Sequence, residues 1–141
     1  KAIVAIGSAH SPARIARGLG VDLREKAESG VSVRLAFSIN AENEDEVQAL
    51  SRYAEVRHVD FLTPVDRHGV DGREFLMSHP IPDDDAPLRG EDIAIWTDDP
   101  AIAAAMGQMT ERIWETAKRS PLTPTVGPAE ATTDATPAAR P

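Results

Sequence analysis

The stretch VSVRLAFSI, residues 31–39, decides the fold class. Its apolar members are Val31, Val33, Leu35, Phe37 and Ile39, and they alternate with Ser32, Arg34, Ala36 and Ser38. A period of two is typical of a β-strand, whose successive side chains point to opposite faces. Gly30 stands directly before the stretch and fits the residue that follows a helix end. The stretch therefore predicts a strand that follows closely on a helix.

Two more strands are predicted on either side of this one. Residues 2–6 form an apolar, β-branched run that ends at Gly7, and residues 56–62 are predicted as a third strand. The run at 2–6 is typical of a buried strand. With the helices between them, the first half alternates strand and helix, which favours a parallel sheet with right-handed crossovers.

Helix signals occupy the two intervals. Ser11-Pro12 is a typical helix start, with serine as the N-cap. The apolar positions that follow are Ile15, Leu19, Leu23 and Ala27, with an interruption expected near Gly18 and Gly20. In the second interval Asn40 is the expected N-cap, because acidic residues that favour a helix N-terminus come after it.

The second half of the chain carries different signals. Asp71-Gly72 predicts a hairpin between strands at about residues 67–70 and 73–78. Residues 93–96 predict another strand, and Asp99-Pro100 predicts the start of a long helix. The expected buried stripe of that helix is Ile102, Met106, Met109, Ile113 and Ala117. We thus expect an α/β fold with a mixed, mostly parallel sheet flanked by helices over residues 1–119, and a disordered Pro/Ala/Thr-rich tail over 120–141.

Composition limits the functions that need to be considered. The formal net charge is −8, which disfavours direct contact with the phosphate backbone of DNA or RNA. The chain has no cysteine, so disulfides and thiolate chemistry are excluded. No apolar run is long enough to span a bilayer, and residues 1–7 do not resemble a signal peptide. We expect a cytoplasmic protein with no membrane partner and no cofactor.

No local motif predicts catalysis or metal binding. The histidines His10, His58, His68 and His79 lack the spacing of a metal site. The run Gly7-Ser8-Ala9-His10 lacks the second glycine of a nucleophile elbow. The acidic run 83–85 lacks the alternation of a calcium loop and is typical of a solvated loop.

Three blocks of the sequence resemble one half of a phospholipase-D-like fold. They are Glu28–Leu35, Val56–His58 and Val70–Ser78. In that family a helix ends at a glycine and leads into a Val-x-Val-Arg strand, and a later strand pair carries a catalytic His-x-Lys followed by an Asp-Gly turn. The segment 93–96 and the helix through Ile113-Trp114 match the close of such domains. The chain is particularly similar to the C-terminal effector domains of archaeal TrmB-type transcriptional regulators.

The catalytic residues that this resemblance implies are missing. With Asp71 at the family's aspartate, Pro64 falls at the histidine and Asp66 at the lysine. Proline cannot attack phosphorus, and a carboxylate repels the phosphate that a lysine would bind. We therefore predict no catalytic residue, and catalysis is not transferred to the nearby His68.

An enzyme site that has lost its catalytic residues can serve as a ligand pocket. We predict a non-catalytic ligand-sensing and dimerisation domain of a transcriptional regulator, which contacts DNA only through a domain outside this chain. It would bind a small polar metabolite or an anion. The candidate ligand-binding residues follow or end strands, where parallel sheets hold ligands: Ser8, His10, Asn40, Arg67, His68 and Asp71. For Asn40, cap or turn chemistry is the stronger interpretation.

Two alternatives remain at this point. One is a phosphodiesterase or nuclease that uses His68 and Asp71 from two subunits, and the other is a purely structural dimerisation domain. A single half of the two-half fold leaves part of its sheet uncovered, so we expect a homodimer. The first strand and the hairpin are the elements predicted to lie nearest the contact.

Overall fold

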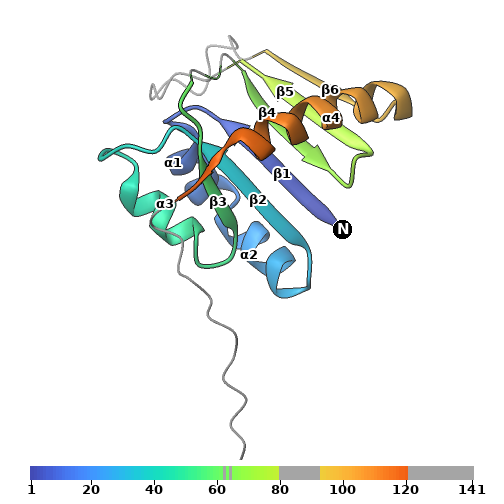
Figure 1. The fold of residues 1–141 in the computed structure, drawn as a ribbon. Helices are drawn as coiled ribbons and strands as arrows, with labels where there is room; N and C mark the ends of the chain where they lie inside the picture. The colour runs from blue at the N-terminus through green and yellow to red at the C-terminus, as the bar shows by residue number, and fades with distance from the viewer. Residues whose placement is uncertain (62, 64, 80–92, 121–141) are drawn as a thin grey trace, which may run out of the picture.

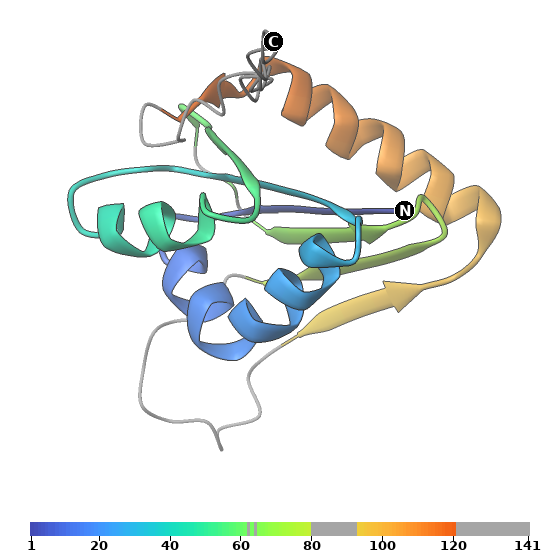
Figure 2. The ribbon, with the colours of Figure 1, turned by 90° about the horizontal axis from the view of Figure 1, so that it is seen from below.

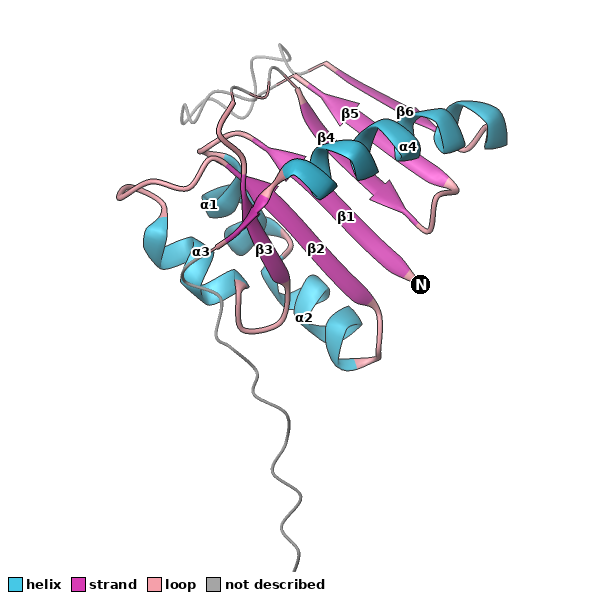
Figure 3. Ribbon diagram, in the orientation of Figure 1, coloured by secondary structure: helices cyan, strands magenta, loops and turns pink. Residues whose placement is uncertain are grey.

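The computed structural model describes residues 1–61, 63, 65–79 and 93–120. In these residues seven strands form one sheet with the order β6-β5-β4-β1-β2-β3-β7 (Figure 1). The strands are β1 (Ala2–Gly7), β2 (Ser32–Phe37), β3 (Glu55–His58), β4 (Asp66–Val70), β5 (Glu74–Ser78), β6 (Ala94–Thr97) and β7 (Lys118–Arg119). β1, β2 and β3 pair in parallel and the other pairs are antiparallel, which confirms a mixed α/β sheet (Figure 3).

Helices cover both faces of the sheet. The helices α1 (Ser11–Gly18), α2 (Gly20–Glu28) and α3 (Glu44–Leu50) lie on one face, and α4 (Pro100–Thr116) crosses the other (Figure 2). Phe37 belongs to the core cluster under the first three helices. Ile6 and Ala36 belong to a second cluster with Trp114 of α4. The alternation in β2 therefore separates two buried layers rather than a buried and a solvated face.

Local signals in the sequence account for several element ends. The helix breaks between Gly18 and Gly20, as expected. After α2, Gly30 has φ +89°, its N–H donates to Ala27 O at 2.9 Å, and Val31 N–H donates to Lys26 O at 3.0 Å. These two bonds form a Schellman motif, which confirms the predicted glycine stop.

The Asp-Gly hairpin is also confirmed. Asp71 and Gly72 have φ +54° and +65°, and Arg73 N–H donates to Val70 O at 2.9 Å. Two successive positive φ angles define a type I′ turn, whose twist matches that of the flanking strands. At the start of α4, Asp99 caps the helix by accepting hydrogen bonds from the N–H groups of the first turn.

Some expectations differ from the structure. The N-cap position of α1 is His10, and Ser11 is the first helical residue, with its hydroxyl turned to Asp66. Asn40 does not cap α3, which begins at Glu44, because its side chain closes a turn by accepting from Glu42 N–H at 2.9 Å. β3 ends at His58 rather than continuing to residue 62, which lies outside the described residues.

The predicted stripe of α4 is out of phase by about one residue. The helix buries Ala103, Thr110 and Trp114. By contrast, Ile102 is half exposed and Met109 is more than half exposed. The hydroxyl of Thr110 is satisfied because it donates to Met106 O at 2.9 Å, so a threonine can face the sheet without an unpaired donor. Two residues of the predicted stripe, Ile113 and Ala117, do pack with Trp114, whereas Ile102 and Met109 face outward.

The sheet order corrects the expected contact for a dimer. β1 lies in the middle of the sheet between β2 and β4, and the hairpin strand β5 is covered by β6. The outer strand on that side is β6, whose residues are largely exposed.

Ser120, the first residue of the predicted tail, packs with the fold. It is buried, and its N–H donates to Val56 O at 3.2 Å.

Candidate functional site

The carboxyl ends of β1, β2 and β3 meet the start of β4 at one edge of the sheet. Asp66, the first residue of β4, is buried there with 6% of its surface exposed. Its Oδ1 accepts a hydrogen bond from Ser8 N–H at 3.1 Å and one from the Ser11 hydroxyl at 3.0 Å. A carboxylate thus occupies the position that the family resemblance gives to a catalytic lysine.

Gly7 is required by this arrangement. A Cβ atom at Gly7 would lie 2.3 Å from Ser11 Oγ and 2.9 Å from Asp66 Oδ1. Both distances are shorter than any normal contact, so a side chain there would push α1 away from the sheet. The close approach leaves the Asp66 carboxylate inside the fold.

Asn43 holds the loops at this edge together and was missed in the sequence. Its Nδ2 donates to Ala9 O at 2.8 Å and to Ser38 O at 2.9 Å, and its Oδ1 accepts from Asn40 N–H at 3.0 Å. The side chain is buried and joins the loop after β1 to the loop after β2. Its position before an acidic first helical turn is the signal that could have found it.

A second polar cluster lies at the end of β3. His58 Nδ1 accepts from Ile39 N–H at 3.0 Å, so the ring proton is on Nε2, which donates to Asp60 Oδ1 at 2.7 Å. Lys118 Nζ reaches Asp60 Oδ2 at 2.5 Å. The bond from Lys118, followed by that from His58, lowers the pKa of the Asp60 carboxyl. This exposed cluster ties the chain after β3 to β7.

The predicted site residues are divided among three places. Ser8, His10 and Asn40 lie together at the carboxyl edge, where His10 lines a cavity of about 220 Å³ with Arg17 and Asn43. Arg67 pairs with Ile6 of the α4 face, and His68 pairs with Ala5 of the opposite face, so the two side chains diverge.

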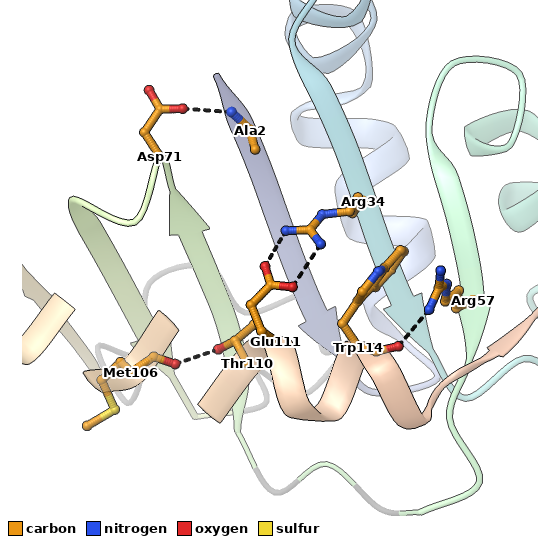
Figure 4. A network of polar contacts seen from close by, with 8 residues as sticks. All are labelled: Ala2, Arg34, Arg57, Asp71, Met106, Thr110, Glu111 and Trp114. Carbon is orange, nitrogen blue, oxygen red and sulfur yellow. Dashed lines mark hydrogen bonds and ion pairs between the residues drawn. The ribbon is translucent and has the colours of Figure 1, made fainter. Parts of the chain in front are cut away.

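Asp71 lies at the other edge of the sheet. Its Oδ1 accepts from Ala2 N–H at 2.6 Å, where β1 begins (Figure 4). This contact, together with the bond from Asp71 N–H to Ala2 O, gives the aspartate a structural role in joining the hairpin to β1. His68 is half-buried, and burial lowers its pKa while the charge of Asp66 opposes the shift.

No group of side chains in the described part of the chain has the arrangement of a metal site. Pro64, the residue at the family's histidine position, and the acidic run 83–85 lie outside the described residues. Among the described helices, none is both long and apolar enough to cross a bilayer.

Comparisons with solved structures identify the fold. No family model and no curated protein sequence matches the chain. TrmBL2, an archaeal chromatin protein with a novel mode of DNA binding, superposes with a TM-score of 0.58 at 18% identity over 84% of this chain. NucT from Helicobacter pylori superposes with a TM-score of 0.64 at 12% identity over 84% of this chain and 82% of its own. The fold is phospholipase-D-like.

This phospholipase-D-like domain corresponds to only part of one neighbour. It spans 45% of the TrmBL2 chain, whereas NucT, a nuclease of the phospholipase D family, is matched over most of its length. The shared fold therefore accommodates both a DNA-binding chromatin protein and a nuclease. The choice between these kinds of function depends on the residues of the site.

Proposed function

We propose that this chain is a non-catalytic ligand-sensing and dimerisation domain of a transcriptional regulator. The observation that carries the proposal is the buried Asp66 at the lysine position, with its Oδ1 held by Ser8 and Ser11. A phosphodiester has no cation to bind at this point, and a carboxylate repels its charge. The likeness in fold to TrmBL2 supports a connection with DNA, which the acidic chain would contact through another domain.

The proposed ligand is a small polar metabolite or an anion that binds beside His10. The cavity there combines the imidazole of His10 and the guanidinium of Arg17 with the carboxylates of Glu42 and Glu46, and it has room for a small molecule only. This mixed lining favours a polar metabolite that carries both donors and acceptors over a simple anion. Asn43 fixes the loop on one side of it by bonding to Ala9 O and Ser38 O. A ligand that contacts both sides would stabilise the folded state in proportion to its occupancy.

The proposed dimer contact is β6 with the adjoining α4. On β6 the side chains of Ile95 and Trp96 are 61% and 56% exposed, and on α4 Ile102 and Met109 are similarly exposed. An uncovered apolar strand at a sheet edge is prone to pair with another chain. A two-fold contact between identical copies would cover this surface in both.

Assays of turnover and of binding distinguish this proposal from its alternatives. We expect no hydrolysis of bis(p-nitrophenyl) phosphate, and a thermal shift with some member of a panel of polar metabolites and anions. His10→Ala should abolish that shift, and Ser29→Ala, a change on the exposed end of α2, should leave it unchanged. Hydrolysis that is lost in His68→Ala would instead support a phosphodiesterase. A protein with neither turnover nor any ligand-induced shift would be a purely structural domain.

A further inference from the structure

A groove of about 810 Å³ separates α4 from the sheet at the edge where β1 begins. Three of the α4 residues that line it are small, namely Ala103, Ala104 and Gly107, and they leave space between the helix and the sheet. A Cβ atom at Gly107 would meet nothing within 4 Å. The sheet opposite contributes Gly69, which also adds no side chain. The volume lies within the range of small-molecule sites, roughly 300 to 1,000 Å³.

The helix is held firmly above this groove. The ring of Trp114 lies between two guanidinium groups, with Arg57 4.2 Å and Arg34 5.2 Å from its centroid. Arg57 also donates to Trp114 O at 2.9 Å, and Arg34 forms a bidentate ion pair with Glu111 (Figure 4). These contacts fix the second half of α4 on the sheet, so the groove is present before any ligand binds.

The floor and the rim of the groove have different chemistry. Val4 and Phe75 line the floor and provide an apolar surface. The carboxylates of Asp71, Glu74 and Glu115 also line the groove. Glu111 is paired with Arg34, so among the described residues that line the groove Arg112 is the remaining cation beside these three carboxylates, which leaves an excess of negative charge.

We propose that this groove binds a small organic cation. Its apolar body would rest on Val4 and Phe75 beneath the gap left by Gly107, and its ammonium group would face the carboxylates of Asp71, Glu74 and Glu115. Charge complementarity selects a cation over an anion of the same shape, and the apolar floor selects an organic cation over a metal ion. The site is at the opposite edge of the sheet from His10, so it does not depend on the ligand proposed there.

Three probes that share one ring test the charge requirement in the full chain. They are 2-phenylethylamine, 2-phenylethanol and phenylacetate, which are positive, neutral and negative at neutral pH. Titration followed by amide NMR shifts should give saturable changes at Gly69, Phe75 and Gly107 with the amine. Loss of one charge contact corresponds to about a tenfold change in affinity, so the alcohol should bind about tenfold more weakly. Phenylacetate should not bind. No saturable shift with the amine, or equal binding of phenylacetate, overturns the proposal.

Substitutions then locate the bound amine. Gly107→Leu fills the groove and replaces a helical glycine, so it should retain the fold and abolish amine binding. Gly18→Leu is the control, because Gly18 is also a helical glycine whose added Cβ atom would meet nothing within 4 Å, but it lies on α1. The double change Glu74→Gln and Glu115→Gln should weaken amine binding by about tenfold or more and leave the alcohol unaffected. Amine binding that survives Gly107→Leu would place the amine elsewhere and refute the site.

Discussion

The Ser11 hydroxyl donates a hydrogen bond of 3.0 Å to Asp66 Oδ1 and so joins the first turn of α1 to the start of β4. The two residues are 55 positions apart in the sequence. The same carboxylate oxygen accepts from Ser8 N–H, so a single atom connects the loop after β1 with α1 and β4. Asp66 is thus part of the packing between these elements.

Asp66→Ala should therefore destabilise the fold. It leaves the Ser11 hydroxyl and the Ser8 N–H without their acceptor, and an unpaired buried donor costs about 1 to 3 kcal/mol. We expect the free energy of unfolding to fall by about 2 kcal/mol or more in urea denaturation. Asp98→Ala, an exposed control, should change it by less than about 0.5 kcal/mol. Similar losses in both variants would contradict this role for Asp66.

Phe37→Ala should be among the most damaging single substitutions. Phe37 is fully buried under the helices on one face of β2, and an aromatic-to-alanine change in a core costs about 3 to 5 kcal/mol. Ser38→Ala, at the next position, should cost less than about 1 kcal/mol, because the Ser38 carbonyl that bonds Asn43 is unchanged. Urea denaturation compares the two, and equal costs would show that the burial of β2 has been misassigned.

The elements that could be predicted from the sequence are those with local signals. Each of these signals depends on residues only a few positions apart, as in the Asp71-Gly72 turn, the Asp99 cap and the glycine that ends α2, Gly30. The strand predicted over 31–39 corresponds to β2, Ser32–Phe37, because the alternation is intrinsic to six or more consecutive residues. These features need no knowledge of distant partners.

The phase of α4 could not be predicted in the same way. Ile102 and Met109 have helical spacing, but so do Ala103, Thr110 and Trp114. Hydrophobicity favours the first set, whereas the close packing of the Trp114 ring between two arginines from β2 and β3 decides for the second. Those arginines lie more than fifty positions earlier, beyond the reach of a pattern within one helix.

The candidate site was predicted in part for a similar reason. Ser8, His10 and Asn40 do lie at the carboxyl edge, because strand ends of a parallel sheet meet there. Asp71 lies at the opposite edge, since it follows a strand that runs antiparallel to β1. Asn43 was missed because its partners, Ala9 and Ser38, belong to two loops that only the folded chain brings together.

The stability of the fold should depend on the charge of His68. Burial lowers the pKa of His68 below its ordinary 6.5, so the folded chain resists protonation and the unfolded chain does not. The free energy of unfolding is therefore unaffected by His68 above about pH 6.5, and it declines as the pH falls toward the pKa of the folded state. His68→Gln removes this loss. The free energy of unfolding of the native chain relative to that variant should decline between about pH 8 and pH 5. A constant difference across that range would contradict the assignment.

Removing residues 121–141 should leave stability nearly unchanged. The segment is rich in Pro, Ala and Thr and has no apolar stripe that could offset the entropy of ordering it. The melting temperature should shift by no more than about two degrees. Removing residues 118–141 is the informative comparison, because it also deletes β7, the Lys118–Asp60 ion pair and the buried Ser120. A large shift from the shorter deletion would show that the tail packs on the domain.

The chain should form a homodimer through β6 and α4. Sedimentation equilibrium at micromolar concentration should give twice the chain mass of 15.1 kDa. Ile95→Lys places a charge on the exposed edge strand, where burying it without a partner is costly, and should give a monomer. Val21→Lys is the matched control, because Val21 is equally exposed on α2 but lies away from β6 in the sheet order, and it should remain a dimer. A native chain that sediments as a monomer would remove the dimer from the proposed function. A dimer that survives Ile95→Lys but not Val21→Lys would move the contact to the face of the sheet that α1, α2 and α3 cover.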